Sequence, residues 1–579
     1  MQFTPEQQAI LDTNTNLVIN AVAGSGKTTT LIAYAASRPP TSSILYLAFN
    51  KTVKTEAEKK FSAAGLKNVT VETAHSLAFK HIMRFSGYSL AQDFRSYEIV
   101  DMLGILSGDR HVDLIIASHV LKFVSYFCNS KAKKVQDLNY VDVITDAKAK
   151  AFVKHHYVQI EKFTRALLAK MDKGEIGISH DFYLKKFQLG SPVLSYDYIL
   201  FDEGQDASGA MLDVFLNQSA IKVIVGDAHQ QIYGWRYAVN SLQQVDFPVY
   251  QLSNSFRFND EVAMVANKIL AWKKHLLLPE AVKIIGAGEA GEFIHTKATI
   301  GRTNLALLIE AIALREKGEI SSVYFEGNIN SYTFADEGAS LYDILNLYNG
   351  KLSSIKDKLI AEMKSMQDLE EYISKTEDNS MSLIVEVVKE FGNKLPSLIS
   401  QLKAAHTVTK EEADMIFSTV HRCKGMEYDQ VSLINDFINE DKLEKTVITA
   451  GAELDTGSKN KLAEEINILY VAATRAKSML IIPEEINPLR SVKVAQKERL
   501  PAKQPMRTSS LTSRMEAAVY KDKFIYSKGN YGKRWTGDDE NILRDLFMQG
   551  TDIRKIARQL ERGETGVKMK LVSLGLLDL

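Results

Sequence analysis

One stretch near the N-terminus constrains the fold of this 579-residue chain more than any other feature. The apolar run 17–19 predicts a buried strand, residues 21–28 form a glycine-rich loop that ends in Gly-Lys-Thr, and residues 29–36 predict a helix. A nucleotide-binding P-loop requires this order, because the N–H groups of the loop and of the helix N-terminus point at phosphate oxygens. The usual first glycine is Ala21 here, but the attached Lys-Thr pair and the preceding strand argue against a chance turn.

The loop and a second, distant segment together predict a site for nucleotide hydrolysis. Lys27 would neutralise the β- and γ-phosphates, and the Thr28 hydroxyl suits a Mg²⁺ ligand. Far downstream, the apolar run 198–201 ends in Asp202 and Glu203. Asp202 would hold the Mg²⁺, directly or through water, and Glu203 would polarise the attacking water. Alone, such an acidic cluster is often a surface turn, but beside a P-loop it predicts catalysis.

Composition narrows the class of protein. The hydrophobic share of 45% and the charged share of 25% are ordinary for a soluble globular chain, and the length suggests about three to five domains. Cys128 and Cys423 are far apart, so neither a disulfide framework nor a zinc site is expected. No apolar run approaches ~18 residues, and the N-terminus lacks the regions of a signal peptide, so no membrane association is expected. The net charge of zero gives no global sign of nucleic acid.

Further motifs, in a fixed order, give the chain a family resemblance. Residues 202–206 read Asp-Glu-Gly-Gln-Asp, which is far more specific than Asp-Glu alone. Other matching segments are Gln7 in a Q motif and residues 45–51, 73–76, 225–236, 254–257, 301–304, 419–428 and 464–476. Together they resemble the UvrD/Rep-like superfamily 1 (1A) DNA helicases. The residues of these motifs are most similar to those of the F-box DNA helicase branch. The F-box itself is missing, so ubiquitin-ligase recruitment is not expected.

The resemblance implies an α/β fold with two RecA-like P-loop NTPase domains, mostly helical insertions and a small all-α C-terminal module that resembles a helix-turn-helix. The expected ranges are 1–80 and 181–255 for the first RecA-like domain, 81–180 for its helical insertion, 256–304 and 406–490 for the second RecA-like domain, 305–405 for its insertion, 491–533 for a basic linker and 534–579 for a three-helix, Myb-like module.

The resemblance also implies ATP and Mg²⁺ as cofactors, bound between the two domains. The expected catalytic residues are Lys27, Asp202, Glu203, Gln230, Arg257 and Arg475, the two arginines acting as arginine fingers. The expected nucleotide-binding residues are Gln7, Ala23, Gly24, Ser25, Gly26, Lys27, Thr28, Thr29, Phe256 and Glu427, with Thr28 and Asp202 on the metal. Gln7 would read the adenine, Phe256 would stack on it and Glu427 would contact the ribose. Thr29 stands where the family usually has an arginine, so stacking from one side only is expected.

Binding to single-stranded DNA needs aromatic faces and cationic groups. The residues expected to supply these contacts, and the polar ones beside them, are Phe49, His75, Tyr233, Trp235, Arg236, Arg302, Thr419 and His421. Trp235 follows Gln230 by five residues, so one segment would sense the γ-phosphate at one end and a base at the other. The alternative for Trp235 and Phe49 is that they are core aromatics. Residues 180–186 would either line the DNA path or form an ordinary amphipathic helix.

The C-terminal region differs in character from the rest. Residues 491–534 carry 11 Lys or Arg and 3 Asp or Glu, a local net charge of +8 that either attracts phosphate backbones or keeps a linker soluble. Thr536 predicts a helix cap, and apolar faces over 542–547, 553–560 and 567–574 predict three short helices. Arg562, Lys568 and Lys570 would face DNA phosphates. The alternative is a protein-docking module.

The leading hypothesis is an ATP-dependent DNA helicase that moves 3′ to 5′ on single-stranded DNA, unwinds duplex at junctions and serves repair or recombination. Its polarity rests on the resemblance alone. The alternatives are a translocase that strips recombinase or other proteins from DNA, and a nucleotide-gated DNA-binding protein. No residue reads a 2′-hydroxyl by sequence, so an RNA substrate stays open. The expected location is cytoplasmic and nucleoid-associated in a bacterial or viral setting, or nuclear or organellar otherwise.

Overall fold

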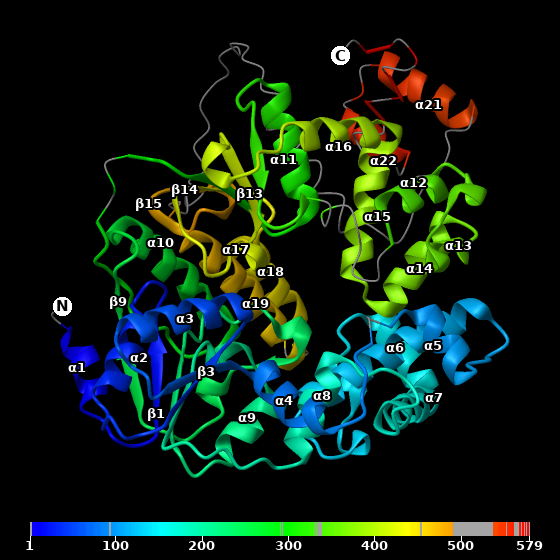
Figure 1. Ribbon diagram of the computed structural model, residues 1–579. Helices are drawn as coiled ribbons and strands as arrows, with labels where there is room; N and C mark the ends of the chain where they lie inside the picture. Colours follow the sequence, from blue (N-terminus) through cyan, green and yellow to red (C-terminus); the bar gives the residue numbers. More distant parts are fainter. Residues whose placement is uncertain are drawn as a thin grey trace. The chain divides into compact units, whose positions relative to one another are not determined.

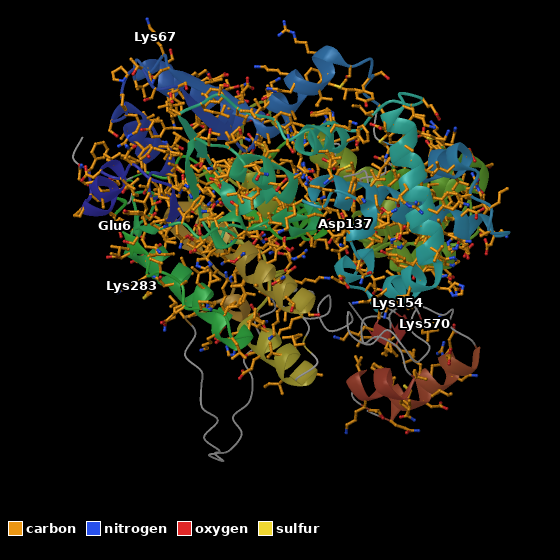
Figure 2. The ribbon with its side chains drawn as sticks, turned by 90° about the horizontal axis from the view of Figure 1, so that it is seen from below. Glu6, Lys67, Asp137, Lys154, Lys283 and Lys570 are labelled. Atoms are coloured by element: carbon orange, nitrogen blue, oxygen red, sulfur yellow. The ribbon has the colours of Figure 1, made fainter. Side chains whose placement is uncertain are left out.

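The computed structural model describes residues 3–91, 94–289, 291, 293–329, 332, 339–451, 454, 456–489, 537–549, 551, 553–560, 567–568, 570–571, 574 and 576–577. The chain divides into two compact units, Met1–Ser491 and Val492–Leu579. In the larger unit, apolar residues fill several cores, while charged side chains such as Lys67 and Lys154 project from its surface (Figure 2).

The first sheet is parallel and has the strand order β3-β2-β4-β6-β1-β8. Its strands are β1 (Leu17–Ala21), β2 (Ile44–Ala48), β3 (Val69–Thr73), β4 (Tyr198–Phe201), β6 (Ile221–Gly226) and β8 (Val249–Leu252). Alternate residues point to opposite faces of a strand. Leu17, Ile19 and Ala21 accordingly pack with α1 (Pro5–Leu11), α2 (Lys27–Ala36) and α3 (Lys51–Ala63). Val18 joins the core on the other face, to which α9 (Gly209–Leu216) contributes.

The second sheet is also parallel, with the order β12-β13-β11-β14-β15. Its strands are β11 (Lys297–Gly301), β12 (Val323–Phe325), β13 (Met415–Thr419), β14 (Tyr428–Leu433) and β15 (Ala476–Ile481). One face packs against α10 (Asp260–Ala271) and α19 (Thr456–Ala473), and the other against α11 (Asn304–Glu316) and α16 (Leu395–Ala404). The ribbon has α10 and α19 on the side facing the first sheet (Figure 1).

The helical insertions differ from the expected ranges at two boundaries. β12 pairs with β13, and α11 packs on the same sheet, so the second insertion begins after residue 325 rather than at 305. A strand of three residues is too short to give a periodic signal. The boundary expected at residue 181 falls inside α8 (His180–Leu189), which contacts α4 (Ala74–Ile82), α6 (Arg110–Asn129) and α9. The apolar face of α8 therefore packs against these helices.

The two insertions pack against each other in one core. The first contains α5 (Ser96–Leu103), α6, α7 (Ala147–Asp172) and α8; the second contains α12 (Leu341–Tyr348), α13 (Lys358–Ala361), α14 (Met366–Thr376), α15 (Asn379–Phe391) and α16. α14 lies against α6 and α7 (Figure 1). By length and hydropathy α6 is able to span a membrane, but 67% of its most apolar window is buried inside this core. Its hydrophobicity is therefore explained by packing between helices.

The smaller unit is described in part. It contains α21 (Gly537–Met548) and α22 (Ile553–Gln559), and a separate apolar cluster that includes Leu543, Ile556 and Leu571. The expected linker 491–533, Thr536 and Arg562 lie outside the described residues. A three-helix module at 534–579 therefore stays a prediction.

Candidate active site where the two sheets meet

The glycine-rich loop joins β1 to α2. Gly24 and Gly26 have φ of +76° and +77°, a conformation that glycine adopts without strain. A Cβ on Gly24 would lie 2.5 Å from the Arg257 Cβ, so only glycine fits there. The buried Ser25 hydroxyl has no hydrogen-bond partner among the described residues. An orphaned buried donor and two loop glycines fit a bound triphosphate.

The carboxylates after β4 lie beside this loop. Lys27 Nζ is 2.8 Å from Glu203 Oε1. Asp202 accepts a short hydrogen bond from the Tyr46 hydroxyl and another, at 2.9 Å, from the Glu203 N–H. Glu203 has a φ of +53°, which is uncommon outside glycine and is typical of functional sites. Parallel strands end at one edge of the sheet, which is how Lys27 and Glu203, 176 positions apart in the chain, come together.

Burial and ion pairing set the protonation of this group. Burial alone would lower the pKa of Lys27, but Glu203, Asp202 and Asp227 outweigh it and raise that pKa above its usual value. Burial and the nearby Glu203 carboxylate raise the pKa of Asp202. Burial opposes ionisation of Glu203 as well, but the charges of Lys27 and Lys424 lower its pKa. The Glu203 carboxylate is therefore ionised at neutral pH and able to orient water.

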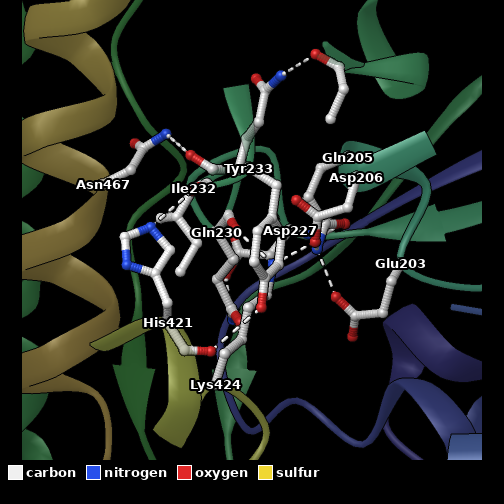
Figure 3. A network of polar contacts seen from close by, with 12 residues as sticks. Glu203, Gln205, Asp206, Asp227, Gln230, Ile232, Tyr233, His421, Lys424 and Asn467 are labelled. Carbon is white, nitrogen blue, oxygen red and sulfur yellow. Dashed lines mark hydrogen bonds and ion pairs between the residues drawn. The ribbon is translucent and has the colours of Figure 1, made fainter. Parts of the chain in front are cut away.

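A polar network runs from Glu203 to the turn after β6 (Figure 3). Gln205 donates a short hydrogen bond to Glu203 and accepts one from the Asp227 N–H at 3.1 Å. Gln230 Nε2 donates to Asp227 Oδ2 at 2.8 Å. Gln230, expected near the γ-phosphate, is thus held in a fixed orientation next to the carboxylates.

The residues expected at the base and ribose lie around the loop. Gln7 caps α1 together with Thr4 and donates from Nε2 to the Thr30 hydroxyl at 3.1 Å. Phe256 is half exposed, and its N–H donates to the Gly24 carbonyl at 2.9 Å. Thr28 and Thr29 occupy the first turn of α2. Thr29 stands where the family usually has an arginine. Among the described residues, Thr29 makes no contact that would take over the role of that arginine.

Both expected arginine fingers have protein partners. Arg257 Nε donates to Glu427 Oε1 at 2.8 Å, and Nη1 donates to the Thr474 carbonyl at 3.2 Å. Arg475 is buried and donates to the carbonyls of Val471 and Met426. Burial lowers the pKa of Arg475 to about 10, and the nearby Arg257 contributes. The two guanidinium groups are thus neighbours, and Glu427, expected at the ribose, holds one of them.

The aromatic residues expected at DNA form a stack that carries a cation. The rings of Phe49 and Tyr233 stack at 5.5 Å with an interplanar angle of 24°. Lys424 Nζ lies 4.9 Å from the centre of the Tyr233 ring and forms a short ion pair with Asp206. Burial raises the pKa of Asp206 to about 6, although Lys424 opposes this shift. Lys424 therefore links the stack to the carboxylate segment.

The other expected DNA contacts are spread over both domains. His421 Nε2 lies 3.0 Å from the Ile232 carbonyl, and Thr419 is buried at the end of β13. Arg302 pairs with both oxygens of Glu465, and His75 Nε2 lies 3.8 Å from Asp181 Oδ1. Arg236 ends a 3-10 turn, Gly234–Arg236. The side chain of Trp235 lies outside what the structure describes, so its expected base contact stays a prediction.

Residues 3–245 match the UvrD/REP helicase N-terminal domain. This part of the chain is therefore similar to that helicase domain. Over 84% of its length the chain is 27% identical to the F-box DNA helicase 1 of Gallus gallus and 29% identical to the F-box DNA helicase protein 1 of Schizosaccharomyces pombe, covering 50% and 58% of those proteins. It is 25% identical to the ATP-dependent DNA helicase PcrA of Bacillus subtilis over 46% of this chain and 39% of that one. The chain thus spans about half the length of the first two relatives.

The match confirms the expected UvrD-like helicase resemblance, including its F-box branch, and implies the RecA-like P-loop α/β fold. Sequence reasoning did not single out three residues that contact the candidate site: Tyr46, Lys424 and Tyr470. All three belong to the matching segments 45–51, 419–428 and 464–476. Tyr46 lies in a buried strand, where an aromatic residue is typical of a core, and the polar atoms of the three side chains are the only signal in the sequence.

Proposed function

We propose that the chain is an ATP-dependent DNA helicase that moves 3′ to 5′ on single-stranded DNA and unwinds duplex. The observation that carries the proposal is the Lys27–Glu203 pair, 2.8 Å apart, next to Asp202 and the oriented Gln230. The same segments adjoin an aromatic stack suited to bases. The names of the relatives support DNA as substrate and ATP as fuel.

Each side chain has a role that its contacts support. Bound ATP with Mg²⁺ supplies the phosphoryl group whose transfer to water releases energy. Lys27 and the loop N–H groups bind the phosphates, and Thr28 and Asp202 offer the hard oxygen ligands that Mg²⁺ prefers. Glu203 accepts the proton of the attacking water. Arg257 and Arg475 offset charge on the transferred group, for which Arg257 exchanges Glu427 for phosphate oxygens.

Coupling to DNA runs through the segment after β6. Gln230 donates to the Asp227 carboxylate, while Tyr233, three residues on, stacks on Phe49. A base that inserts against these rings moves the segment that carries Gln230. Single-stranded DNA and single-strand/duplex junctions are therefore the proposed partners, in DNA repair or recombination. Recombinase filaments on the same strand are proteins that such a translocase would displace.

The test is steady-state ATPase with and without single-stranded DNA, beside unwinding of duplexes with 3′ or 5′ tails. We expect strong stimulation by DNA and unwinding from the 3′ tail. Stimulation without unwinding would favour a protein-stripping translocase instead. A chain that hydrolyses ATP equally with and without DNA would contradict the proposed coupling.

The Lys27→Ala variant gives the first prediction. Removing the ammonium leaves the phosphates without their main cation, so we expect kcat to fall by roughly 10³-fold or more, as for a phosphate-stabilising cation. Binding to single-stranded DNA without nucleotide should stay within a factor of two. Lys67→Ala, at an exposed lysine, is the matched control. Turnover retained in Lys27→Ala would refute the assignment of the loop.

A further inference from the structure

Tyr470 connects the two domains through one buried hydroxyl. The residue lies on α19 of the second domain and has no exposed surface. Its hydroxyl donates to Asp227 Oδ2 at 2.9 Å and accepts from the Ala23 N–H at 3.2 Å. Ala23 belongs to the glycine-rich loop, and Asp227 begins the turn that carries Gln230. One group of the second domain thus contacts both phosphate-facing segments of the first.

The Asp227 carboxylate links Tyr470 to Gln230, because it accepts hydrogen bonds from both side chains. Oδ2 accepts from Gln230 Nε2 at 2.8 Å as well as from Tyr470, and Oδ1 accepts from the His229 N–H at 2.9 Å. Asp227 is 1% exposed, so water cannot replace a lost donor without opening the site. The position of the carboxylate, and with it the orientation of Gln230, depends on the Tyr470 hydroxyl.

Lys273 holds the same turn from a second direction. It lies in the 3-10 helix Trp272–Leu276 after α10, is 6% exposed and places Nζ 2.7 Å from His229 Nδ1. Burial lowers the pKa of Lys273 to about 8, and the Asp227 charge opposes this. The ring of His229 meets Tyr470 edge-on at 6.3 Å. Two side chains of the second domain, Tyr470 and Lys273, therefore contact the turn 227–230 and hold its position.

Apolar packing also holds the glycine-rich loop against the second domain. Val22 and Ala23 are buried in the cluster formed by α10 and α19, not in the core of their own sheet. The start of the glycine-rich loop thus rests on the second domain. A shift of α19 displaces the loop and the turn together.

We propose that Tyr470 is a positioning residue for nucleotide hydrolysis, assisted by Lys273, which orients Gln230 and the glycine-rich loop when the second domain is in place. The proposal rests on the ATPase function proposed above. It adds a route by which a DNA-driven movement of α19 reaches the hydrolysis site, through a hydroxyl outside the expected catalytic set.

The test compares the full chain with its Tyr470→Phe variant, which keeps the ring and removes the hydroxyl. We expect kcat in the presence of single-stranded DNA to fall about ten-fold or more, the worth of a hydrogen bond to a buried charged group. The KM for ATP should change less than about three-fold, because the phosphate-binding groups remain. Tyr140→Phe, which removes another buried hydroxyl, from a contact with His119, is the matched control and should keep the wild-type kcat.

A double-mutant cycle with Lys273→Met separates positioning from general destabilisation. If both residues act through the turn 227–230, the losses in kcat of the two single variants will not add in the double variant. Additive losses, or a kcat of Tyr470→Phe equal to that of Tyr140→Phe, would overturn the proposal while the ATPase function stands. A wild-type chain without ATPase activity would overturn both.

Discussion

Arg302 illustrates how a residue's local partner decides what it is able to do. Its Nε and Nη2 atoms lie 2.6 and 2.5 Å from the two oxygens of Glu465, and its N–H donates to Asp436. A guanidinium paired with both oxygens of one carboxylate has geometric specificity and little freedom. Arg302 therefore has a structural role in addition to the DNA contact expected of it.

This pair gives a prediction about stability. Arg302→Ala leaves the Glu465 carboxylate, 20% exposed, without its partner, so we expect the free energy of unfolding to fall by about 1–3 kcal/mol. Removing both groups in Arg302→Ala/Glu465→Ala should restore part of that loss. Urea unfolding of the three chains measures it.

The same double variant then isolates the DNA contact. If Arg302 also binds a phosphate, the stability-restored double variant will bind single-stranded DNA more weakly, and its log–log salt slope will be shallower by roughly one unit. An unchanged slope would assign Arg302 to the ion pair alone.

The sequence could identify the residues expected to carry the chemistry, but not the hydrogen-bond and ion-pair partners of the residues around them. Lys27, Asp202 and Glu203 follow strands and a loop whose local pattern fixes their position, so a linear motif suffices to find them. The partners Glu465 of Arg302 and Asp227 of Tyr470 lie 163 and 243 residues away. The Arg302 pairing depends on how the second domain folds, and the Tyr470 pairing depends on how the two domains pack; no local periodicity encodes either.

At the scale of elements, the contact between the two insertions is built on α14 and α6. His119 on α6 is fully buried and places Nε2 2.8 Å from the Lys375 carbonyl and Nδ1 3.1 Å from the Tyr140 hydroxyl. Glu377 follows α14 with a φ of +54° and accepts hydrogen bonds from Thr145 and Asp146 at the start of α7. Helix ends and a buried imidazole thus hold the insertions together.

His119 makes this contact sensitive to pH. Burial lowers the pKa of His119 from 6.5 to about 3, so the folded chain keeps it neutral while the unfolded chain protonates it. Its contribution to stability is complete above pH 6.5 and is lost as the pH falls from 6.5 towards 3. The slope is at most about 1.4 kcal/mol per pH unit for one proton.

Comparing urea unfolding at pH 7 and pH 5 measures this effect. We expect His119→Gln to lose less stability on acidification than the wild type. His155→Gln, at an exposed histidine of α7, should keep the wild-type dependence. Parallel losses in both variants would show that other groups cause the acid sensitivity.

Elements with a strong local pattern were predictable and those without one were not. The apolar runs 17–19, 198–201 and 223–225 fall in β1, β4 and β6, and the run 431–434 covers the end of β14 and the residue after it, because strands buried on both faces are continuously hydrophobic. β12 has three residues and becomes a strand only because β13 offers an edge to pair with. The register of helix α14 on α6 likewise follows from tertiary packing.

At the scale of the whole molecule, charge is distributed unevenly between the two compact units. The chain has 71 basic and 71 acidic residues, yet residues 491–534 alone carry a net +8. The larger unit, Met1–Ser491, holds both sheets, the insertions and all the catalytic candidates. The catalytic candidates and this basic stretch therefore fall in different parts of the chain.

Truncation after Ser491 tests this division. Because the larger unit has its own cores and the removed unit has a separate one, we expect the same melting temperature and a near-normal kcat at saturating DNA. The affinity for single-stranded DNA should fall, and its log–log salt dependence should become shallower, since each phosphate contact contributes a slope of roughly 0.7 on a single strand. Replacing the basic residues of 491–534 by glutamine in the full chain is the matched control for charge. If the truncated and full chains share one salt slope, the C-terminal unit docks protein rather than DNA, and the motor's grip on the strand comes from the residues around Phe49 and Tyr233 alone.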